Sequence, residues 1–306
     1  MTSSSPYVIS GASGHIGGAI ATSLLALHLP VRVIGRSPSL LAPLVAKGAE
    51  AAVGSLEDTA FLTRALAGAR AAFVMIPPNL STPDFAAYSA RVSAAYVDAL
   101  KTSPATHAVV LSSIGAHHAT GLGPISLLHR HEARLAELAR LHQLVLRPAY
   151  FMENHLQGIP LITGMGIYGS PAKPELSFAQ IATSDIAAVA ALRLAALDFS
   201  GRSVVELLGA RDYTMLESTR ILGTAIGRPQ LPYVPFPYAD ARGAMISMGI
   251  SASVADGFVE MYQGFNGGLA AATQPRSAAT TTPTTLEQFA TAVFAPACAA
   301  KGHARG

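Results

Sequence analysis

Several residue types are scarce in this 306-residue sequence, and each scarcity excludes a class of protein. Charged residues make up only 13% of the chain and apolar residues 50%, which is typical of a compact globular protein and excludes a disordered one. The single cysteine, Cys298, has no partner for an internal disulfide. A lone thiol suits a reducing compartment, so we expect a cytoplasmic protein.

Long apolar runs and clusters of basic residues are missing as well. No apolar segment reaches the ~18 to 20 residues that a membrane-spanning helix requires, and residues 1–6 lack the basic and apolar regions of a secretory leader. The net charge is only +3, with no run of Lys or Arg. We therefore expect no membrane partner and no direct nucleic-acid partner.

A glycine-rich stretch near the N-terminus is the most informative feature that is present. Residues 7–10 form a short apolar run, residues 11–17 read Gly-Ala-Ser-Gly-His-Ile-Gly, and an Ala/Leu-rich segment follows to residue 28. Strand, tight turn and helix are predicted in that order, and a second apolar run at residues 31–34 completes a βαβ unit. Such a unit is typical of dinucleotide-binding proteins.

The three glycines of this stretch have different physical roles. Gly11 allows the sharp turn after the strand, Gly14 lets backbone N–H groups approach a pyrophosphate, and Gly17 lets the helix pack closely against the sheet. A helix N-terminus favours an anion because its N–H groups are free and its dipole end is positive. We expect the cofactor phosphates to be bound by Gly11, Ser13, Gly14, His15, Ile16 and Gly17.

The end of the second predicted strand decides which dinucleotide is bound. An NAD site usually has an Asp or Glu there for the ribose 2′-hydroxyl, whereas an NADP site accommodates Arg. The first acidic residue of this chain is Glu50, and Arg36 and Ser37 occupy the strand end. A guanidinium can bind a 2′-phosphate through paired hydrogen bonds. The sequence therefore predicts NADP(H) as the cofactor, in contact with Arg36 and Ser37.

Strands and helices alternate up to about residue 150, which predicts an α/β fold with a doubly wound parallel Rossmann sheet. We interpret residues 1–150 as the NADP-binding Rossmann domain and residues 151–306 as a smaller mixed lobe that covers the substrate pocket, with parts that pack back on the first domain. Further strands are predicted at 50–53, 71–76, 107–111 and 144–146, and helices at 38–47, 59–66, 84–100 and 127–141.

The pattern is less regular in the second half, where Gly and Pro become frequent. Helices are predicted at 183–197, 213–226 and 284–294, two short helices within 242–265, an extended connection at 228–237 and a mobile Thr/Ala-rich linker at 271–283.

Ligands of doubly wound sheets bind at the carboxyl ends of the strands. Three residues that directly follow predicted strands are therefore expected to contact the cofactor, with the two serines near the ribose or nicotinamide: Pro77, Ser112 and Ser113. No Gly-x-Ser-x-Gly elbow surrounds the serines, which argues against a nucleophilic role.

Motifs spread along the chain match one known family. They are the glycine loop, the Arg36 position, Ile76-Pro77-Pro78, Leu111-Ser112-Ser113-Ile114-Gly115-Ala116, Leu146-Arg147-Pro148-Ala149-Tyr150-Phe151-Met152-Glu153-Asn154 and Ser184-Asp185-Ile186-Ala187. On these motifs the chain resembles the NmrA-like branch of the atypical short-chain dehydrogenase/reductases over nearly its whole length.

The resemblance implies fold and cofactor more firmly than activity. The family includes NADPH-dependent reductases of quinones, dyes and phenolic natural products, and also members that bind the nucleotide without turnover and act as redox-sensing regulators. Such proteins commonly carry an Asp near the adenine in a Gly-Asp-Leu sequence. This chain has Gly54-Ser55-Leu56 instead, so the contact would fall to the Ser55 hydroxyl or to backbone.

The Tyr-x-x-x-Lys pair of the wider superfamily is absent, because none of the four lysines lies four residues after a tyrosine. In the same part of the chain, His129 and Glu132 are three residues apart on a predicted helix, so the carboxylate could orient the imidazole. His129 is either a proton donor or substrate anchor, or part of a polar helix face. Tyr150 is a second candidate donor or part of a packed aromatic corner, and we expect the substrate pocket to include Tyr150, Phe151 and Asn154.

Metal binding finds little support in the sequence, and we expect no metal site. His117 and His118 are adjacent in a loop, and His129 and His131 point to different faces of a helix. Asp185 lies near a predicted helix N-terminus, where it is most simply a cap or a dipole partner.

Three functional hypotheses remain open. The leading one is an NADPH-dependent oxidoreductase that transfers hydride to a small conjugated carbonyl, a quinone-like compound or a natural-product intermediate, because a delocalised acceptor does not need a strong proton donor. The alternatives are a non-catalytic NADP(H)-sensing regulator with a protein partner, and a non-redox isomerase on the same fold. The subunit count is open, with a homodimer as one option.

Overall fold

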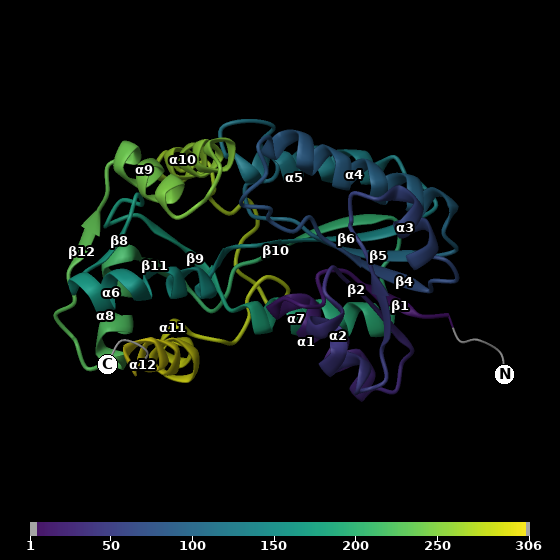
Figure 1. The fold of residues 1–306 in the computed structure, drawn as a ribbon, viewed down its shortest axis with the longest axis horizontal. Helices are drawn as coiled ribbons and strands as arrows, with labels where there is room; N and C mark the ends of the chain where they lie inside the picture. The colour runs from purple at the N-terminus through teal and green to yellow at the C-terminus, as the bar shows by residue number, and fades with distance from the viewer. Residues whose placement is uncertain (1–4, 304–306) are drawn as a thin grey trace.

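A seven-stranded sheet organises the molecule (Figure 1). The computed structural model describes residues 5–303. The strand order is β10-β6-β5-β4-β1-β2-β3 and all neighbours are parallel, so the chain runs outward from β1 in both directions, as predicted for a doubly wound fold. The strands are β1 (Tyr7–Ile9), β2 (Val31–Gly35), β3 (Glu50–Val53), β4 (Ala71–Val74), β5 (His107–Leu111), β6 (His142–Pro148) and β10 (Arg202–Leu207).

Helices cover both faces of this sheet (Figure 1). The central strands are apolar without interruption because both faces are buried. Along β1, Ile9 packs into the core on one face and Val8 into the core on the other. One face carries α1 (His15–Ala26), α2 (Pro38–Val45) and α7 (Thr183–Ala196), and the other α3 (Thr59–Ala65), α4 (Phe85–Thr102) and α5 (Pro124–Ala136).

The second half of the chain forms a smaller lobe beside the carboxyl ends of the large sheet (Figure 1). It contains a three-stranded sheet, β11-β9-β7, and a two-stranded sheet, β12-β8. Its strands are β7 (Tyr150–Phe151), β8 (Tyr168–Ser170), β9 (Ser177–Ile181), β11 (Asp212–Thr214) and β12 (Tyr233–Pro235). Its helical elements are η1 (Met152–Gly158), α6 (Ile159–Met165), α8 (Met215–Ala225), α9 (Tyr238–Ser247), α10 (Ala252–Asn266), α11 (Leu286–Phe289), η2 (Ala290–Phe294) and α12 (Ala295–His303).

Two elements after residue 150 belong to the large sheet layer. β10 pairs with β6 along six residues, and α7 packs against α1. The division into residues 1–150 and 151–306, with parts of the second half packing back, stays our proposal for the domain organisation. Within residues 5–303, none of the helices is both long and apolar enough to cross a membrane.

Residues 271–283 were predicted to be a mobile linker, but hydrogen bonds hold the start of this segment. The segment has no regular structure, but a buried carboxylate holds it. Thr273 donates both its backbone N–H and its hydroxyl to Glu206, each at 2.8 Å, and the Gln274 N–H donates to the same carboxylate at 2.9 Å. Side chains therefore fasten this segment to the outermost strand of the sheet.

Other differences concern element boundaries. The predicted helix 127–141 begins and ends earlier, as α5, because Pro124 can start a helix at its first position. The predicted helix 213–226 begins with strand β11, and the predicted extended connection 228–237 contains strand β12. These short strands lack the apolar alternation that would have revealed them.

Candidate functional site

The glycine loop between β1 and α1 has the geometry that the spacing predicts. Gly11 has a φ of +64°, a left-handed conformation that side chains other than glycine rarely adopt. A Cβ at position 17 would lie 2.5 Å from the Gly11 carbonyl oxygen and 2.6 Å from the Ser10 carbonyl oxygen. Only a glycine lets α1 approach the strand this closely.

The first turn of α1 is open to an anion. Gly14 precedes the helix, and its N–H donates to the Gly11 carbonyl at 2.9 Å. The N–H groups of His15, Ile16 and Gly17 have no acceptor within the helix, because the first helical bond runs from the Gly18 N–H to the Gly14 carbonyl. No acidic residue stands in this turn to repel a phosphate.

A cleft of about 90 Å³ adjoins the loop at the carboxyl ends of β1, β2, β3 and β4. Its lining includes five of the residues predicted to bind the cofactor, all of them outside the helix: Gly11, Ser13, Arg36, Ser55 and Pro77. Ile16 and Gly17 are buried beneath the loop and can offer backbone only.

Arg36 projects into this cleft without a partner. Its side chain is exposed and makes no hydrogen bond or ion pair with any of residues 5–303. The neighbouring Ser37 hydroxyl lies 2.8 Å from the Ser39 hydroxyl, just before α2. The cleft therefore presents a free guanidinium beside a helix N-terminus, a combination that suits two phosphate groups on one ligand.

Ser55 lines the cleft, so its predicted contact with the adenine stays a prediction, and its hydroxyl also has a local role. Its hydroxyl oxygen accepts the Glu57 N–H at 3.2 Å and so fixes the turn after β3. Glu57 itself lines the cleft, and its carboxylate accepts from Arg91 Nε at 2.8 Å. Glu57 could not be recognised from sequence, because a lone Glu in a turn resembles any solvated acid.

Tyr88 closes the far side of the cleft. Its hydroxyl donates to the Pro77 carbonyl at 3.0 Å. Burial raises the pKa of Tyr88, the nearby Glu57 carboxylate raises it further, and the Arg36 guanidinium lowers it. The charged groups of Glu57 and Arg36 therefore lie close to this tyrosine and shift its pKa in opposite directions.

Glu132 of α5, which is 3% exposed, binds side chains from the carboxyl ends of β5 and β6 and from the first residue of β10. Arg147 donates to both carboxylate oxygens, from Nε at 2.9 Å and from Nη2 at 2.7 Å. Arg202 donates from Nη2 at 2.9 Å, and the Ser112 hydroxyl donates at 2.5 Å. Two positive charges therefore surround the Glu132 carboxylate, and the Ser112 side chain points toward it.

The predicted pairing of His129 with Glu132 is therefore wrong. The His129 Nδ1–H donates to the Ala116 carbonyl at 2.9 Å, while Glu132 is saturated by the two arginines and Ser112. His129 remains partly exposed, so its role as proton donor or substrate anchor stays a prediction. Ser113 is also partly exposed, and its hydroxyl donates to the Ile114 carbonyl at 3.0 Å.

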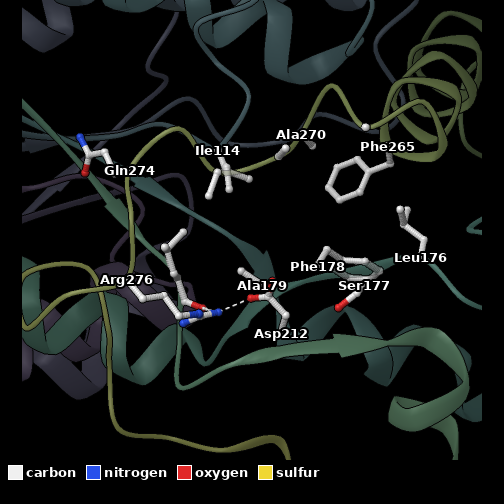
Figure 2. A pocket seen from close by; sticks show the side chains of 14 residues that line it. Ile114, Leu176, Ser177, Phe178, Ala179, Asp212, Phe265, Ala270, Gln274 and Arg276 are labelled. Carbon is white, nitrogen blue, oxygen red and sulfur yellow. Dashed lines mark hydrogen bonds and ion pairs between the residues drawn. The ribbon is translucent and has the colours of Figure 1, made fainter.

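A cavity of about 220 Å³ lies between the large sheet and the smaller lobe (Figure 2). Its apolar walls include Ile114, just after Ser113, and the rings of Phe178 and Phe265, which meet edge to face at 5.8 Å. Figure 2 shows Arg276 on the side of the cavity away from the Phe265 ring, with a hydrogen bond to Asp212. An apolar cavity with a few polar groups is typical of a small-molecule site.

Tyr150 lies behind the two phenylalanines of the cavity. Its ring centroid is 5.3 Å from that of Phe178 and 6.4 Å from that of Phe265. Burial raises the pKa of Tyr150 well above its usual range, so the phenol keeps its proton at neutral pH. Phe151 packs against the sheet core and Asn154 lies in η1. None of the three residues predicted for the substrate pocket, Tyr150 included, lines this cavity.

Asp185 lies in the first turn of α7, where the dipole-partner prediction places it, but it does not cap the helix. Its carboxylate accepts the N–H of Thr284 at 3.0 Å and the Thr284 hydroxyl at 2.6 Å, so it holds the segment before α11. The start of α7 is instead capped by Glu153, which accepts from the Thr183 N–H at 3.0 Å. Within the described part of the chain, His, Cys, Asp and Glu side chains form no group of three or more that could hold a metal ion.

The sequence matches the NAD(P)H-binding family over residues 11–196, from the glycine loop to the last residue of α7. The match covers more than half of the chain, so the protein belongs to this family. The loop, the open helix N-terminus and the cleft with Arg36 lie within the matched part and fit a dinucleotide.

Named relatives agree with this assignment. The chain is 28% identical to the NAD(P)H azoreductase of Xenophilus azovorans over 255 residues, which are 83% of this chain and 85% of the relative. Two solved structures share its fold. An NADPH-dependent quinone oxidoreductase of Escherichia coli complexed with NADPH has a TM-score of 0.78, 23% identity and coverage of 94% and 99%. The Citrobacter sp. triphenylmethane reductase complexed with NADP(H) has a TM-score of 0.76, 17% identity and coverage of 93% and 98%.

Proposed function

We propose that this protein is an NADPH-dependent oxidoreductase that transfers hydride to a small conjugated carbonyl or quinone-like compound. The observation that carries the cofactor choice is the guanidinium of Arg36, which follows β2 and has no partner among the described residues, while the residues directly after this strand include no Asp or Glu. The reductase names of the azoreductase relative and of both structural neighbours support the reaction type.

The chain's own residues supply binding and orientation. The glycine loop and the first turn of α1 would hold the pyrophosphate, and Arg36 with Ser37 would hold the 2′-phosphate. Ser113 would contact the nicotinamide end, and the nucleotide would supply hydride when bound. The cavity beside Ile114 would hold the substrate, between apolar walls that include Phe178 and Phe265.

Protonation does not require the missing Tyr-x-x-x-Lys pair. Hydride addition to a quinone-like acceptor spreads the negative charge over a conjugated system, so a weak acid or solvent can complete the reaction. Tyr150 and His129 are the two candidate donors of this chain. A tyrosine keeps its proton at neutral pH in any environment of this kind, and burial raises the pKa of Tyr150 further, which makes it a weak acid.

The test is turnover of NADPH with a panel of quinones, enones and azo or triarylmethane dyes, followed at the absorbance of reduced nicotinamide. We expect turnover with at least one class, and a lower kcat in Tyr150→Phe or His129→Ala if either residue is the donor. Phe151→Leu is a matched control, since Phe151 packs against the sheet core and has no proton to donate. Tight NADPH binding without turnover of any compound would favour a nucleotide-sensing regulator.

A further inference from the structure

The cleft beside the glycine loop has room for more of the cofactor than its phosphates. With the pyrophosphate on the loop and the 2′-phosphate at Arg36, the adenine base must extend from the ribose toward the ends of β3 and β4. That part of the cleft is lined by Ser55, Leu56, Glu57, Pro77 and Tyr88. The base therefore meets mostly apolar surface and one carboxylate.

The polar groups in that part of the cleft differ in what they can offer a base. The Ser55 hydroxyl oxygen accepts the Glu57 N–H and keeps its own O–H as a donor, whereas the Tyr88 hydroxyl donates to the Pro77 carbonyl. Glu57 offers a charged acceptor. Its Oε2 accepts from Arg91 Nε at 2.8 Å, whereas its Oε1 makes no hydrogen bond with any residue that the structure describes.

The position of Glu57 is fixed on two sides. The Ser55 hydroxyl holds its backbone, and Arg91 of α4 holds one carboxylate oxygen, which leaves the side chain 32% exposed. Arg91 also balances the negative charge of Glu57. The carboxylate can therefore stand in the same cleft as the bound phosphates without repelling them strongly.

We propose that Glu57 recognises the adenine base, by accepting a hydrogen bond from the 6-amino group at its free Oε1. The 6-amino group is a donor, and a carboxylate accepts only, so the two are complementary. A base with a carbonyl oxygen at position 6 would place two acceptors against each other and leave both unsatisfied. Arg36 selects the phosphate of the nucleotide, and Glu57 selects its base.

The test compares NADPH with its hypoxanthine analogue, nicotinamide hypoxanthine dinucleotide phosphate, which has a carbonyl oxygen in place of the amino group. Dissociation constants are measured by titration calorimetry with no substrate present. We expect the wild-type protein to bind NADPH about 10- to 100-fold more tightly than the analogue, the range of one hydrogen bond to a charged group. In Glu57→Ala this preference disappears, because NADPH binding weakens and analogue binding does not.

Two variants make the comparison specific. Arg91→Ala removes the same ion pair but keeps the acceptor, so it should keep the preference for NADPH. Arg36→Ala should weaken both nucleotides by the same factor, because both carry the 2′-phosphate.

Equal affinity of the wild-type protein for both nucleotides would overturn the proposal, and so would a preference that survives in Glu57→Ala. Glu57 takes part only in a partly exposed ion pair, so loss of its side chain should not prevent folding. The readout is binding alone, so the result is independent of whether the protein reduces any substrate.

Discussion

The two halves of the sheet's carboxyl edge differ in whether their polar groups have hydrogen-bond partners within the protein. At the ends of β1, β2 and β3, Arg36 is exposed and has no partner among the described residues, and the first N–H groups of α1 are unpaired within the helix. At the ends of β5, β6 and β10, Glu132 and Glu206 are buried and fully hydrogen-bonded within the protein.

This difference separates ligand-binding groups from groups that hold the fold. A buried carboxylate is stable only when its partners are present, so Glu132 and Glu206 fix the neighbouring elements. An exposed guanidinium in a cleft has no such internal role, and its charge is available to a ligand. The contrast also explains why Ser112, which bonds to Glu132, is a weaker candidate for a cofactor contact than Ser113.

We call the ends of β5, β6 and β10 the saturated half and the ends of β1, β2 and β3 the open half. The largest expected effect is a loss of stability from a substitution in the saturated half. Glu132→Ala leaves Arg147 and Arg202 without their shared carboxylate, and breaking a buried ion pair typically lowers the free energy of unfolding by about 3 to 5 kcal/mol. Urea denaturation measures this loss. Arg91→Ala is the control on the open half, where removing the exposed pair with Glu57 should change stability by less than about 1 kcal/mol. Equal losses in the two variants would break the comparison.

The next effect is a loss of stability in acid. Burial lowers the pKa of His131 and of His155 to about 4, so the folded protein keeps both rings neutral where the unfolded chain, with a pKa near 6.5, is protonated. Stability is therefore full above pH 6.5 and falls as the pH is lowered from 6.5 to 4, by about 3 kcal/mol for each histidine at most.

Denaturation at a series of pH values measures this loss, and a variant separates the histidine contribution from that of the carboxylates. His155 bonds to the Tyr168 hydroxyl at 2.6 Å and to Gln180 Oε1 at 2.8 Å. His155→Gln removes the titrating ring, so its stability should depend less steeply on pH between 6.5 and 4. If the stability of this variant depended on pH as steeply as that of the wild-type protein, the His155 ring would not be the source of the loss in acid.

A smaller effect is expected at the cavity wall. Glu206 anchors Thr273 and Gln274, and Ala270, Gln274 and Arg276 of that segment line the cavity. Glu206→Ala should raise the KM for the reducible substrate about tenfold, equivalent to one lost interaction of about 1.4 kcal/mol, with the NADPH dissociation constant unchanged.

Asp185→Ala is the matched control for that variant. Asp185 accepts a backbone N–H and a hydroxyl from Thr284 in the same way as Glu206 does from Thr273, but it holds the segment beyond the cavity. The KM of the Asp185→Ala variant should stay near the wild-type value. A KM that rises equally in both variants would mean that general loosening, not the cavity wall, is responsible.

The open half could be predicted from sequence because its features are local. The glycine loop, the helix start and Arg36 lie within one βαβ unit, where residue spacing alone fixes which groups meet. The saturated half could not be predicted in this way. Arg202 is 70 residues from Glu132, and Thr273 is 67 residues from Glu206, so no short-range pattern connects them. The predicted pairing of His129 with Glu132 was wrong. Helix spacing allowed this pairing, but Arg147 and Arg202 bind the carboxylate instead.

The recognition of phosphorylated ribose by Arg36 is tested most directly by the dissociation constants of NADPH and NADH, measured side by side for the wild-type protein and for Arg36→Ala. We expect the wild-type protein to prefer NADPH. The variant should lose about 1.5 to 3 kcal/mol of NADPH binding, the worth of a hydrogen bond to a charged group, with little change for NADH. Equal affinities of the wild-type protein for the two nucleotides, or an equal loss for both in the variant, would contradict the account.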